Sequence, residues 1–588
     1  MLESETKTCQ SCKNNFVIEP EDFEFYQKIN VPQPTWCPEC RMIRRFVWRN
    51  ERTIFRRKDS VTGKEIISEF HPEISTPIYP HTYWYGDTWD PMEYGRSYDF
   101  SRPFFEQFKE LLELVPAPSQ SVMNIINSEY NNNVSDLKNC YLCFHAGGIE
   151  NSAYVVGANT IKDSFDLYHT KNAELCYYGY MIDESYKIFF SINCEASFEV
   201  WFSKNLIGCN NCFGCINLRK KSYCIFNKQV SKEEYLDFIA DFNSGSFQKI
   251  LAMQEKVYAF WKNFPDRFTL GFRNVNSTGE HLQDCKNVNY SFDVHDGLDL
   301  KYCQDVTDSK DSYDHSIGWE SFSLCYENNT VADAYNIKFS YKCWPNVSYL
   351  RYAIFCLSSS HLFGCVGLRK KEYCIFNKQY TKEEYKELVP KIIKHMDDMP
   401  YIDKMGRIYK FGEFFPPEFS PFAYNETIAQ DFFPLTKEEI EEKGFLYREA
   451  PVNEYQITMK AEDLPDAIED LSKDATDQIL KEVIECIECK RAYRIIEMEL
   501  SFYRRIPLPL PRSCYKCRFA QLFKFVNPPK FWKRKCHCTG TESENNLYKN
   551  TAEHIHGTEP CPIIMDTSYA PEKTEIVYCE KCYQQEVA

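Results

Sequence analysis

The same four-cysteine pattern occurs near both ends of this sequence. In each copy two CxxC pairs are separated by 24 residues, between Cys12 and Cys37 and again between Cys489 and Cys514. Four thiolates form a closed tetrahedral site for a structural zinc ion and leave no position for a substrate. The pattern therefore predicts two modules that fold around zinc. Their ligands are Cys9, Cys12, Cys37, Cys40 and Cys486, Cys489, Cys514, Cys517.

The likeness between the two segments extends beyond their cysteines. Shifted by 477 positions, Ile18 matches Ile495 and Arg41 matches Arg518. We interpret the two modules as products of an internal duplication.

A basic and aromatic stretch follows the last cysteine of each module. Residues 37–58 hold eight Arg or Lys, and residues 512–535 hold eight with no acidic residue, in a chain of formal net charge -16. Cations interleaved with aromatic rings suit a phosphate backbone with stackable bases, which predicts binding of RNA or single-stranded DNA. The alternative is that the rings form a β-hairpin core, and that the cations form its solvated face or pair with acidic neighbouring domains. The residues assigned to nucleic acid are Arg44, Arg45, Trp48, Arg49, Arg52, Phe525, Trp532, Lys533 and Arg534.

The C-terminal copy carries extra cysteines. "CHCTG" at 536–540 stands where the N-terminal copy reads "DSVTG" at 59–63. We expect a third four-thiolate zinc site here, because closely spaced thiolates are strong zinc ligands. The predicted ligands are Cys536, Cys538, Cys579 and Cys582, and the competing ligands are His554, His556 and Cys561.

The middle of the chain is also repetitive. Residues 214–235 return as residues 364–385, and upstream of each block short strand-sized units recur about every 9 to 12 residues. Alternating strand segments with polar corners and no room for helices between them predict a solenoid of stacked short strands. Its cysteines are expected to pack as small apolar residues. Zinc binding by Cys209, Cys212, Cys215 and Cys224 is not favoured, because the repeated block keeps only Cys365 and Cys374.

Helices are expected at the ends of the solenoid halves. "SKEEYLDFI" and "TKEEYKELV" begin with a capping box, the first continuing to about Phe264 with a break near Gly245, and residues 101–114 and 463–484 also have helical patterns. The fold class is therefore mainly β with α: a duplicated short-rung β-solenoid flanked by two homologous four-cysteine, zinc-ribbon-like modules and capping helices. The predicted domains are an N-terminal zinc module with a basic β-hairpin (1–100), a capping helix with the first solenoid half and its closing helix (101–265), the second half and its closing helix (266–400), an irregular linker and helix (401–484), and a C-terminal zinc module with a zinc-bound tail (485–588).

The segments "VPQPTWCPECR", "FSRPFFEQFKELL", "LRKKSYCIFNKQ" and "RAYRIIEMELSFYRR" resemble a family of uncharacterised, cysteine-rich, zinc-binding proteins from candidate-phylum bacteria with reduced gene sets. The resemblance implies zinc and a duplicated architecture, and it implies no substrate, because that family has no assigned activity. At Asp59 the resemblance implies a cysteine that this chain lacks.

These observations favour a non-enzymatic, zinc-stabilised scaffold that binds nucleic acid, with a protein partner as a further candidate. The rival is a carbohydrate-binding or carbohydrate-active β-helix using Asp293, Asp296 and Asp299, and this class is not favoured because acidic residues are common at solenoid corners. The sequence has no signal-peptide pattern at its start and no apolar run of about 18 residues, so we expect a soluble, cytoplasmic protein with no membrane contact. A small-molecule substrate is not expected, since no phosphate loop or catalytic constellation is present.

Overall fold

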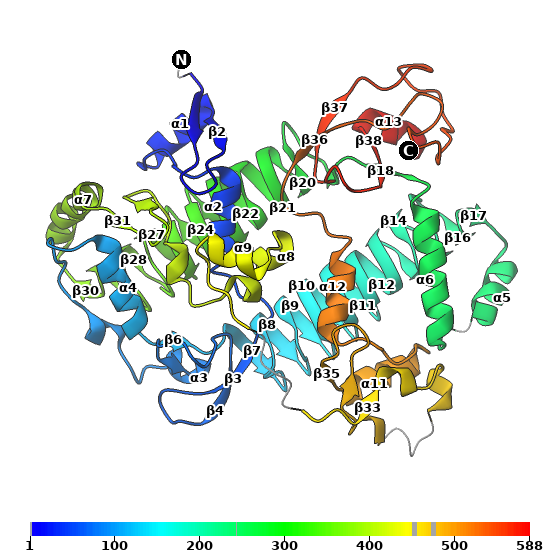
Figure 1. Ribbon diagram of the computed structural model, residues 1–588, viewed down its shortest axis with the longest axis horizontal. Helices are drawn as coiled ribbons and strands as arrows, with labels where there is room; N and C mark the ends of the chain where they lie inside the picture. Colours follow the sequence, from blue (N-terminus) through cyan, green and yellow to red (C-terminus); the bar gives the residue numbers. More distant parts are fainter. Residues whose placement is uncertain (1–2, 243, 450–454, 472–477, 588) are drawn as a thin grey trace. The chain divides into compact units, whose positions relative to one another are not determined.

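The computed structural model describes residues 3–242, 244–449, 455–471 and 478–587 (Figure 1). The chain is mainly β with helices. It divides into two compact units, each built from segments that are distant in sequence. The first unit comprises Met1–Gln120, Thr269–Arg448 and Pro528–Phe531, and the second comprises Ser121–Phe268, Glu449–Asn527 and Trp532–Ala588.

An 11-stranded sheet forms the centre of the second unit, and all its pairs are parallel except the last, β16 with β17. Residues pair with the residue twelve positions later, as in Val155 with Leu167 and Leu167 with Gly179. The strands are β7 (Val122–Ile126), β8 (Asn132–Lys138), β9 (Phe144–Glu150), β10 (Ala153–Lys162), β11 (Phe165–Glu174), β12 (Tyr177–Glu195), β13 (Phe198–Trp201), β14 (Lys204–Ile207), β15 (Asn210–Phe213), β16 (Ser222–Ile225) and β17 (Lys228–Gln229).

A 12-stranded sheet of the same kind forms the centre of the first unit. Its long strands also pair at a spacing of twelve, for example Val294 with Val306. The strands are β19 (Gly271–Phe272), β20 (Thr278–Gln283), β21 (Lys286–Lys301), β22 (Gln304–Gly318), β23 (Phe322–Ser323), β24 (Tyr326–Val331), β25 (Ala334–Tyr335), β26 (Lys338–Cys343), β27 (Val347–Arg351), β28 (Ser360–Phe363), β29 (Glu372–Ile375) and β30 (Lys378–Gln379).

Burial in these strands has a period of three, so the predicted alternation of two is wrong. From β12 through the link to β13, the fully buried column is Ile188, Ser191, Cys194, Ser197 and Val200. The residue before each of them has a positive φ, as in Asn193 (φ 51) and Ala196 (φ 47). A left-handed residue in every third position turns the chain, so the pleat that makes side chains alternate does not develop. Paired residues lie twelve positions apart, so each repeat of the sheet consists of four such three-residue units.

Side-chain ladders connect successive registers of the second unit's sheet. Asn127 Nδ2 donates to Asn139 Oδ1 at 3.1 Å, Asn139 to Asn151 at 3.0 Å, and Asn151 to Asp163 at 3.1 Å. Asn and Asp tolerate the left-handed conformation that these positions need. The ladder therefore combines backbone compatibility with hydrogen bonding between neighbours.

The cysteines of the central sheets are packing residues, as predicted. Cys209, Cys212, Cys215 and Cys224 are buried, and they belong to the apolar core of the second unit together with aliphatic side chains. They are in none of the candidate metal-binding groups found in the part of the chain that the structure describes.

Helices end both sheets where the capping boxes predicted them. In the second unit α5 (Lys232–Phe242) starts at Ser231, whose backbone N–H donates to Glu234 at 2.8 Å, and α6 (Phe247–Trp261) follows the predicted break. In the first unit α7 (Lys382–Asp398) starts at Thr381 with the same motif.

Helix α4 (Phe104–Leu114) forms as predicted but belongs to the first unit. Phe104 packs against Phe363 of β28 with ring centroids 5.4 Å apart. The expectation that this helix covers the first solenoid half is therefore wrong, because its aromatic face is complementary to strands of the later half.

Smaller elements of the first unit are β1 (Glu5–Thr8), β2 (Asn15–Ile18), α1 (Pro20–Lys28), α2 (Pro38–Phe46), β3 (Phe55–Lys58), β4 (Glu65–Ser68), β5 (Ile78–Tyr79), α3 (His81–Trp84), η1 (Pro91–Tyr94), β6 (Ala117–Pro118), β31 (Tyr401–Ile402), β32 (Ile408–Tyr409), η2 (Pro417–Phe419), η3 (Tyr424–Glu426), α8 (Ile428–Phe432) and α9 (Lys437–Glu442).

The segment 463–484 does not form the single helix that its pattern predicts. It includes the 3-10 turn η5 (Ile468–Asp470) and ends in β34 (Ile484–Glu485), while residues 472–477 lie outside the described residues. Other elements of the second unit are β18 (Pro265–Arg267), β33 (Met459–Lys460), η4 (Ala461–Asp463), β35 (Ala492–Tyr493), α11 (Glu497–Arg505), α12 (Tyr515–Phe523), β36 (Trp532–Lys535), β37 (Ile564–Thr567), β38 (Ile576–Tyr578) and α13 (Glu580–Val587). Across the described residues, no helix has the length and apolar character needed to cross a membrane.

Candidate metal centres

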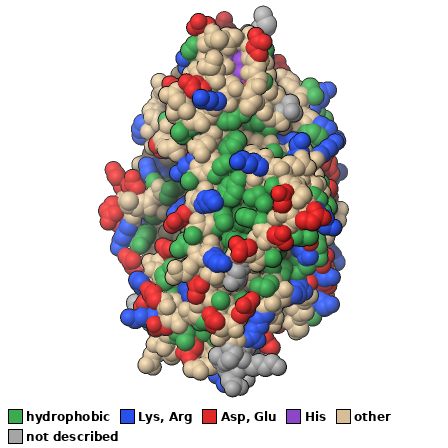
Figure 2. Space-filling model, turned by 90° about the vertical axis from the view of Figure 1, so that its right-hand side faces the viewer, with side chains coloured by type: hydrophobic (Ala, Val, Ile, Leu, Met, Phe, Trp, Pro, Cys, Tyr) green, Lys and Arg blue, Asp and Glu red, His purple; other side chains and the backbone are tan. Residues whose placement is uncertain are grey.

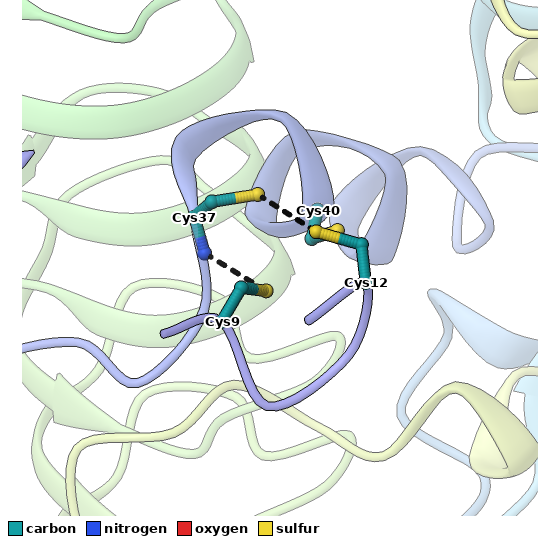
Figure 3. Close-up of side chains that lie close together, drawn as sticks. All are labelled: Cys9, Cys12, Cys37 and Cys40. Carbon is teal, nitrogen blue, oxygen red and sulfur yellow. Dashed lines mark hydrogen bonds between the residues drawn. The ribbon is translucent and has the colours of Figure 1, made fainter. Parts of the chain in front are cut away.

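The first candidate centre joins the β1–β2 turn to the start of α2 (Figure 3). Cys9 and Cys12 lie in the turn, which Lys13 closes with a φ of 64°. Cys37 precedes the first residue of α2, and Cys40 lies in its first turn. The backbone N–H of Cys37 donates to Cys9 Sγ at 3.2 Å, so the helix start already points toward the sulfur cluster. The four sulfur atoms lie within 4.8 Å of one another.

The second candidate centre has the same local geometry. Cys486 and Cys489 lie in a turn closed by Lys490 (φ 58), and Cys514 precedes α12. The backbone N–H of Cys514 donates to Cys486 Sγ at 3.2 Å, the same distance as in the first centre. Cys517 completes a group within the same 4.8 Å limit.

The sulfur spacings fit a tetrahedral metal ion. A metal–sulfur distance of about 2.3 Å and tetrahedral angles place neighbouring sulfurs about 3.8 Å apart. The Sγ–Sγ distance is 3.8 Å between Cys12 and Cys37 and 3.7 Å between Cys489 and Cys514. Both groups could therefore hold a metal ion, with four protein ligands around it.

The groups also favour thiolate at one ligand of each centre. Hydrogen bonds from the side chains of Cys37 and Cys40 lower the pKa of Cys9 far below its usual range, despite burial. Burial opposes ionisation of Cys486, but the backbone N–H groups of Cys489 and Cys514 lower its pKa to about 7. Within the first group the pKa of Cys40 is raised, first by its hydrogen bond to Cys37 and then by that to Cys9, so these contacts favour one thiolate and not four. A metal ion binds the thiolate form of cysteine.

Residues 536–582 contain two further groups in place of the single predicted one. Cys536, Cys561, Cys579 and Cys582 form a group in which all four are buried, and Cys538, His554, His556 and Cys582 form another. The prediction of one Cys536–Cys538–Cys579–Cys582 site is therefore wrong in its ligand set: Cys538 lies with the histidines, and Cys561 takes its place beside Cys579. The path of the backbone explains why Cys561 takes the place of Cys538. The N–H of Cys561 donates to the carbonyl of Cys538 at 2.9 Å, which holds the Cys561 segment beside the Cys538 segment.

Asp59 stands where the resemblance implies a cysteine, and it has a structural role. Its carboxylate accepts hydrogen bonds from the backbone N–H of Val61 at 2.8 Å and of Lys64 at 3.1 Å, and from the Thr62 hydroxyl at 2.6 Å. It thus closes the β3–β4 turn without a metal ligand.

Four arginines of the N-terminal basic stretch, namely Arg41, Arg44, Arg45 and Arg49, are buried ion-pair partners. Helix α2 lies beside β22 and β24 (Figure 1), and its residues Arg44 and Arg45 are buried in the first unit. Arg44 contacts Glu327 and Glu413, each at 2.7 Å, and Arg45 contacts Asp314 at 3.0 Å. Both side chains are 0% exposed. A buried arginine requires such partners, because removing a charge from water is costly unless it is compensated.

Arg49 and Trp48 are enclosed as well. Arg49 pairs with Glu51 and donates to the Thr330 hydroxyl at 3.0 Å, and Trp48 packs against Phe415 with centroids 5.2 Å apart. Arg52 is half-buried and pairs with Asp431. The assignment of Arg44, Arg45, Trp48 and Arg49 to a nucleic-acid surface is therefore wrong, because all four are buried. The alternative of ion pairing with acidic neighbours describes the three arginines, whereas Trp48 packs in the core of the first unit.

The C-terminal basic stretch is more accessible. Lys533 and Lys535 are exposed on β36, with Lys533 directly opposite Asp566 of β37. Arg534 donates to the Ala570 carbonyl at 3.0 Å, and Trp532 is half-buried. Phe525 packs against Tyr258 of α6 in edge geometry, with centroids 5.3 Å apart.

Charges of both signs are interspersed over the face drawn in Figure 2, where hydrophobic side chains gather in the middle. Asp293, Asp296 and Asp299 each lie at a left-handed corner of β21, with φ between 53° and 55°. Asp299 accepts a hydrogen bond from Asn287 at 2.8 Å, a ladder contact of the kind seen in the second unit.

Comparisons with known proteins supply no family. No family model matches the sequence, and no curated protein matches it. Among solved structures, one described as a candidate acetyltransferase from Desulfovibrio desulfuricans G20 aligns at 10% identity over 49% of this chain and 86% of that chain, with a TM-score of 0.10. A likeness at that TM-score carries no argument about fold or activity.

Proposed function

We propose that this chain is a non-enzymatic scaffold in which zinc ions hold arginine-bearing helices against two short-rung β-solenoids. The twelve-residue register of both parallel sheets, with terminal helices α5 and α7, supports the solenoid interpretation. Parallel coils that contact only their neighbours expose open ends, and a terminal helix covers them.

The observation that carries the proposal is the position of the arginine after each four-cysteine group. Arg41, one residue after Cys40, contacts Asp314 of β22 at 2.8 Å. Arg518, one residue after Cys517, contacts Asp166 of β11 at 2.9 Å. Each arginine also donates to the backbone carbonyl of the residue before the third cysteine, Trp36 or Ser513. A metal ion that fixes the helix start therefore fixes the arginine that joins the helix to the sheet.

Zinc is the ion that the ligand sets favour. All-thiolate tetrahedral groups select zinc or iron–sulfur chemistry, and a closed group with no open position suits a structural ion. The equivalent hydrogen bonds of the two modules support their origin by duplication. Four protein ligands at each ion leave no coordination position for a substrate, which is the basis for proposing a scaffold.

Two serine substitutions test this proposal. Cys12 and Cys489 are exposed, so Cys12→Ser and Cys489→Ser remove a ligand without opening the core. Cys176→Ser is the matched control, because Cys176 is a buried sheet residue whose neighbour twelve positions earlier is Ser164. We expect each ligand variant to lose one zinc ion in elemental analysis and to unfold at a lower temperature, while the control keeps its zinc. Full zinc content and an unchanged melting temperature in both ligand variants would contradict the proposal.

Nucleic-acid binding is a second candidate, now restricted to the C-terminal stretch. Lys524, Lys533 and Lys535 are exposed, and residues 512–535 contain no acidic residue. We expect salt-dependent binding of labelled single-stranded RNA that is lost when these three lysines become serine. Equal binding by the variant, or none by the zinc-loaded protein, would reject this candidate.

A further inference from the structure

We infer that the seven residues Cys536, Cys538, His554, His556, Cys561, Cys579 and Cys582, here called the C-terminal cluster, form a binuclear zinc centre in which Cys582 bridges both ions. This inference rests on the proposed zinc chemistry of the chain and concerns a site of different composition from the two four-cysteine modules.

The first argument is that one sulfur atom belongs to two complete ligand sets. Cys582 Sγ lies within 4.8 Å of every ligand atom of the Cys536–Cys561–Cys579 set and of the Cys538–His554–His556 set. Sulfur spacing in the first set fits a tetrahedral ion, with Cys561 Sγ and Cys579 Sγ 3.9 Å apart. Each set supplies three ligands of its own, and a bridging Cys582 gives both ions the four ligands that structural zinc requires.

The second argument comes from the histidines. His554 Nδ1 faces Cys538 Sγ at 3.5 Å, while its Nε2 contacts the Glu586 carboxylate at 2.8 Å. His556 Nε2 faces Cys582 Sγ at 3.3 Å, while its Nδ1 contacts the Glu559 carbonyl at 2.6 Å. Metal-binding histidines have this arrangement, with the outer nitrogen donating to a carboxylate or carbonyl that fixes the ring.

Charge supports two ions rather than one. Five cysteines of the C-terminal cluster are buried, and so are His554 and Glu586. Five thiolates carry five negative charges, of which a single divalent ion compensates two and a pair of ions compensates four. Uncompensated charge in a buried site is costly, so the ligand number favours the pair.

The local fold explains how the seven ligands meet. Cys536 follows β36, Cys579 follows β38, and Cys582 lies in the first turn of α13. The backbone N–H of Cys579 donates to Cys536 Sγ at 3.2 Å, which repeats the helix-start contact of both four-cysteine modules. The Asn550 side chain donates to Cys538 Sγ at 3.3 Å and brings the histidine segment toward the second set. The first set thus resembles a four-cysteine module, and the histidine segment adds a second ion to it.

Metal stoichiometry tests the inference on the full-length protein. Elemental analysis after gel filtration should give one zinc ion for each of the four groups, and three in the double variant His554→Ala/His556→Ala. Cys176→Ser is the control and should keep all four ions. Because the histidine variant removes no ligand of the first set, that set should retain its ion.

Cadmium substitution tests the bridge itself without any variant. With cadmium-113 in place of zinc, two ions that share one sulfur give two resonances with scalar coupling to each other. Four ions, loss of one ion in the histidine variant and a coupled pair of resonances are the expected results. Three ions in the unmodified protein, an unchanged count in the histidine variant, or four uncoupled resonances would overturn the bridge, whereas a protein without zinc would overturn the proposed function as well.

Discussion

Arg41 Nη2 and Asp314 Oδ2 lie 2.8 Å apart in the first unit, although the two residues are far apart in sequence. Arg518 and Asp166 make the corresponding contact in the second unit, across 352 positions. The N-terminal four-cysteine module therefore docks on the sheet of the later half of the chain, and the C-terminal module docks on the sheet of the earlier half.

The Arg518–Asp166 pair should be important for the stability of the second unit. Arg518→Met leaves Asp166 buried without its cation, and removal of one partner of a buried pair costs about 3–5 kcal/mol of unfolding free energy. Urea unfolding of the single variant measures this loss.

Two companion variants make the measurement specific to the pair. Arg518 also pairs with the buried Glu499 at 3.1 Å. The triple variant Arg518→Met/Asp166→Leu/Glu499→Gln should therefore recover much of the loss, because no charge is left unpaired. Arg56→Met, in the exposed Arg56–Glu65 pair, should change stability by less than about 1 kcal/mol. Equal losses in the single and triple variants would show that the ion pairs of Arg518 are not the cause.

Burial with a period of three makes opposite predictions for two adjacent residues of β14. Leu206 is 0% exposed and Ile207 is 37% exposed. Leu206→Ala should cost about 2–5 kcal/mol through lost packing and a cavity, whereas Ile207→Ala should stay within about 0.5 kcal/mol. Chemical denaturation of both variants provides the comparison, and similar losses at the two positions would contradict the inward column.

His315 should contribute to acid sensitivity. Burial, with the nearby charge of Arg45, lowers the pKa of His315 to about 3 in the folded protein. An unfolded histidine titrates near pH 6.5, so between about pH 6.5 and 3 the unfolded state binds more protons and stability falls as pH falls. The contribution is fully present above pH 6.5.

His315→Leu should therefore reduce the slope of the unfolding free energy against pH by up to about 1.4 kcal/mol per pH unit on the acid side of pH 6.5. Urea midpoints of the variant and the unmodified protein at pH 7, 6 and 5 give the difference in slope. Parallel pH profiles would mean that His315 is protonated equally in both states.

Metal release should occur in two phases. Cys12 and Cys489 are exposed, whereas the cysteines of the C-terminal cluster are buried. A chromogenic chelator should remove ions from the two four-cysteine modules first and from the C-terminal cluster later. Release in a single phase, or an unchanged fast phase in a Cys12→Ser variant that has already lost its ion, would be inconsistent with this order.

The members of the two four-cysteine groups could be predicted from the sequence because CxxC spacing is a local property. Both cysteines of each pair lie in one turn or one helix start, so distant packing does not change their pairing. The C-terminal cluster was predicted only in part, since Cys561 and the histidines join it through the course of a loop. The signal is present in the His554–His556 spacing and in Cys561, which the sequence offers as competing ligands.

Whether the cations of the basic stretch are buried or exposed could not be predicted from the local sequence. Arg44 pairs with Glu327 and Glu413, which lie 283 and 369 positions away. A cluster of cations looks the same whether it faces solvent or a distant carboxylate. The three-residue period was missed for a related reason: left-handed positions are occupied by residues as different as Asn193, Ala196 and Phe202, so composition does not mark them.

Because each unit is built from segments that are distant in sequence, residues that contact each other in one unit are translated at different times. The module with Cys9 and Cys40 leaves the ribosome long before Asp314 is made, and at about 5–20 residues per second this interval is on the order of tens of seconds. During that time Arg41, Arg44 and Arg45 have no sheet to enter. The last segment of chain in the first unit, Pro528–Phe531, arrives after most of the second unit has been translated. A chain that stalls before Glu413 would therefore display unpaired arginines in its first unit, whereas Arg518 of the second unit is made long after its partner Asp166.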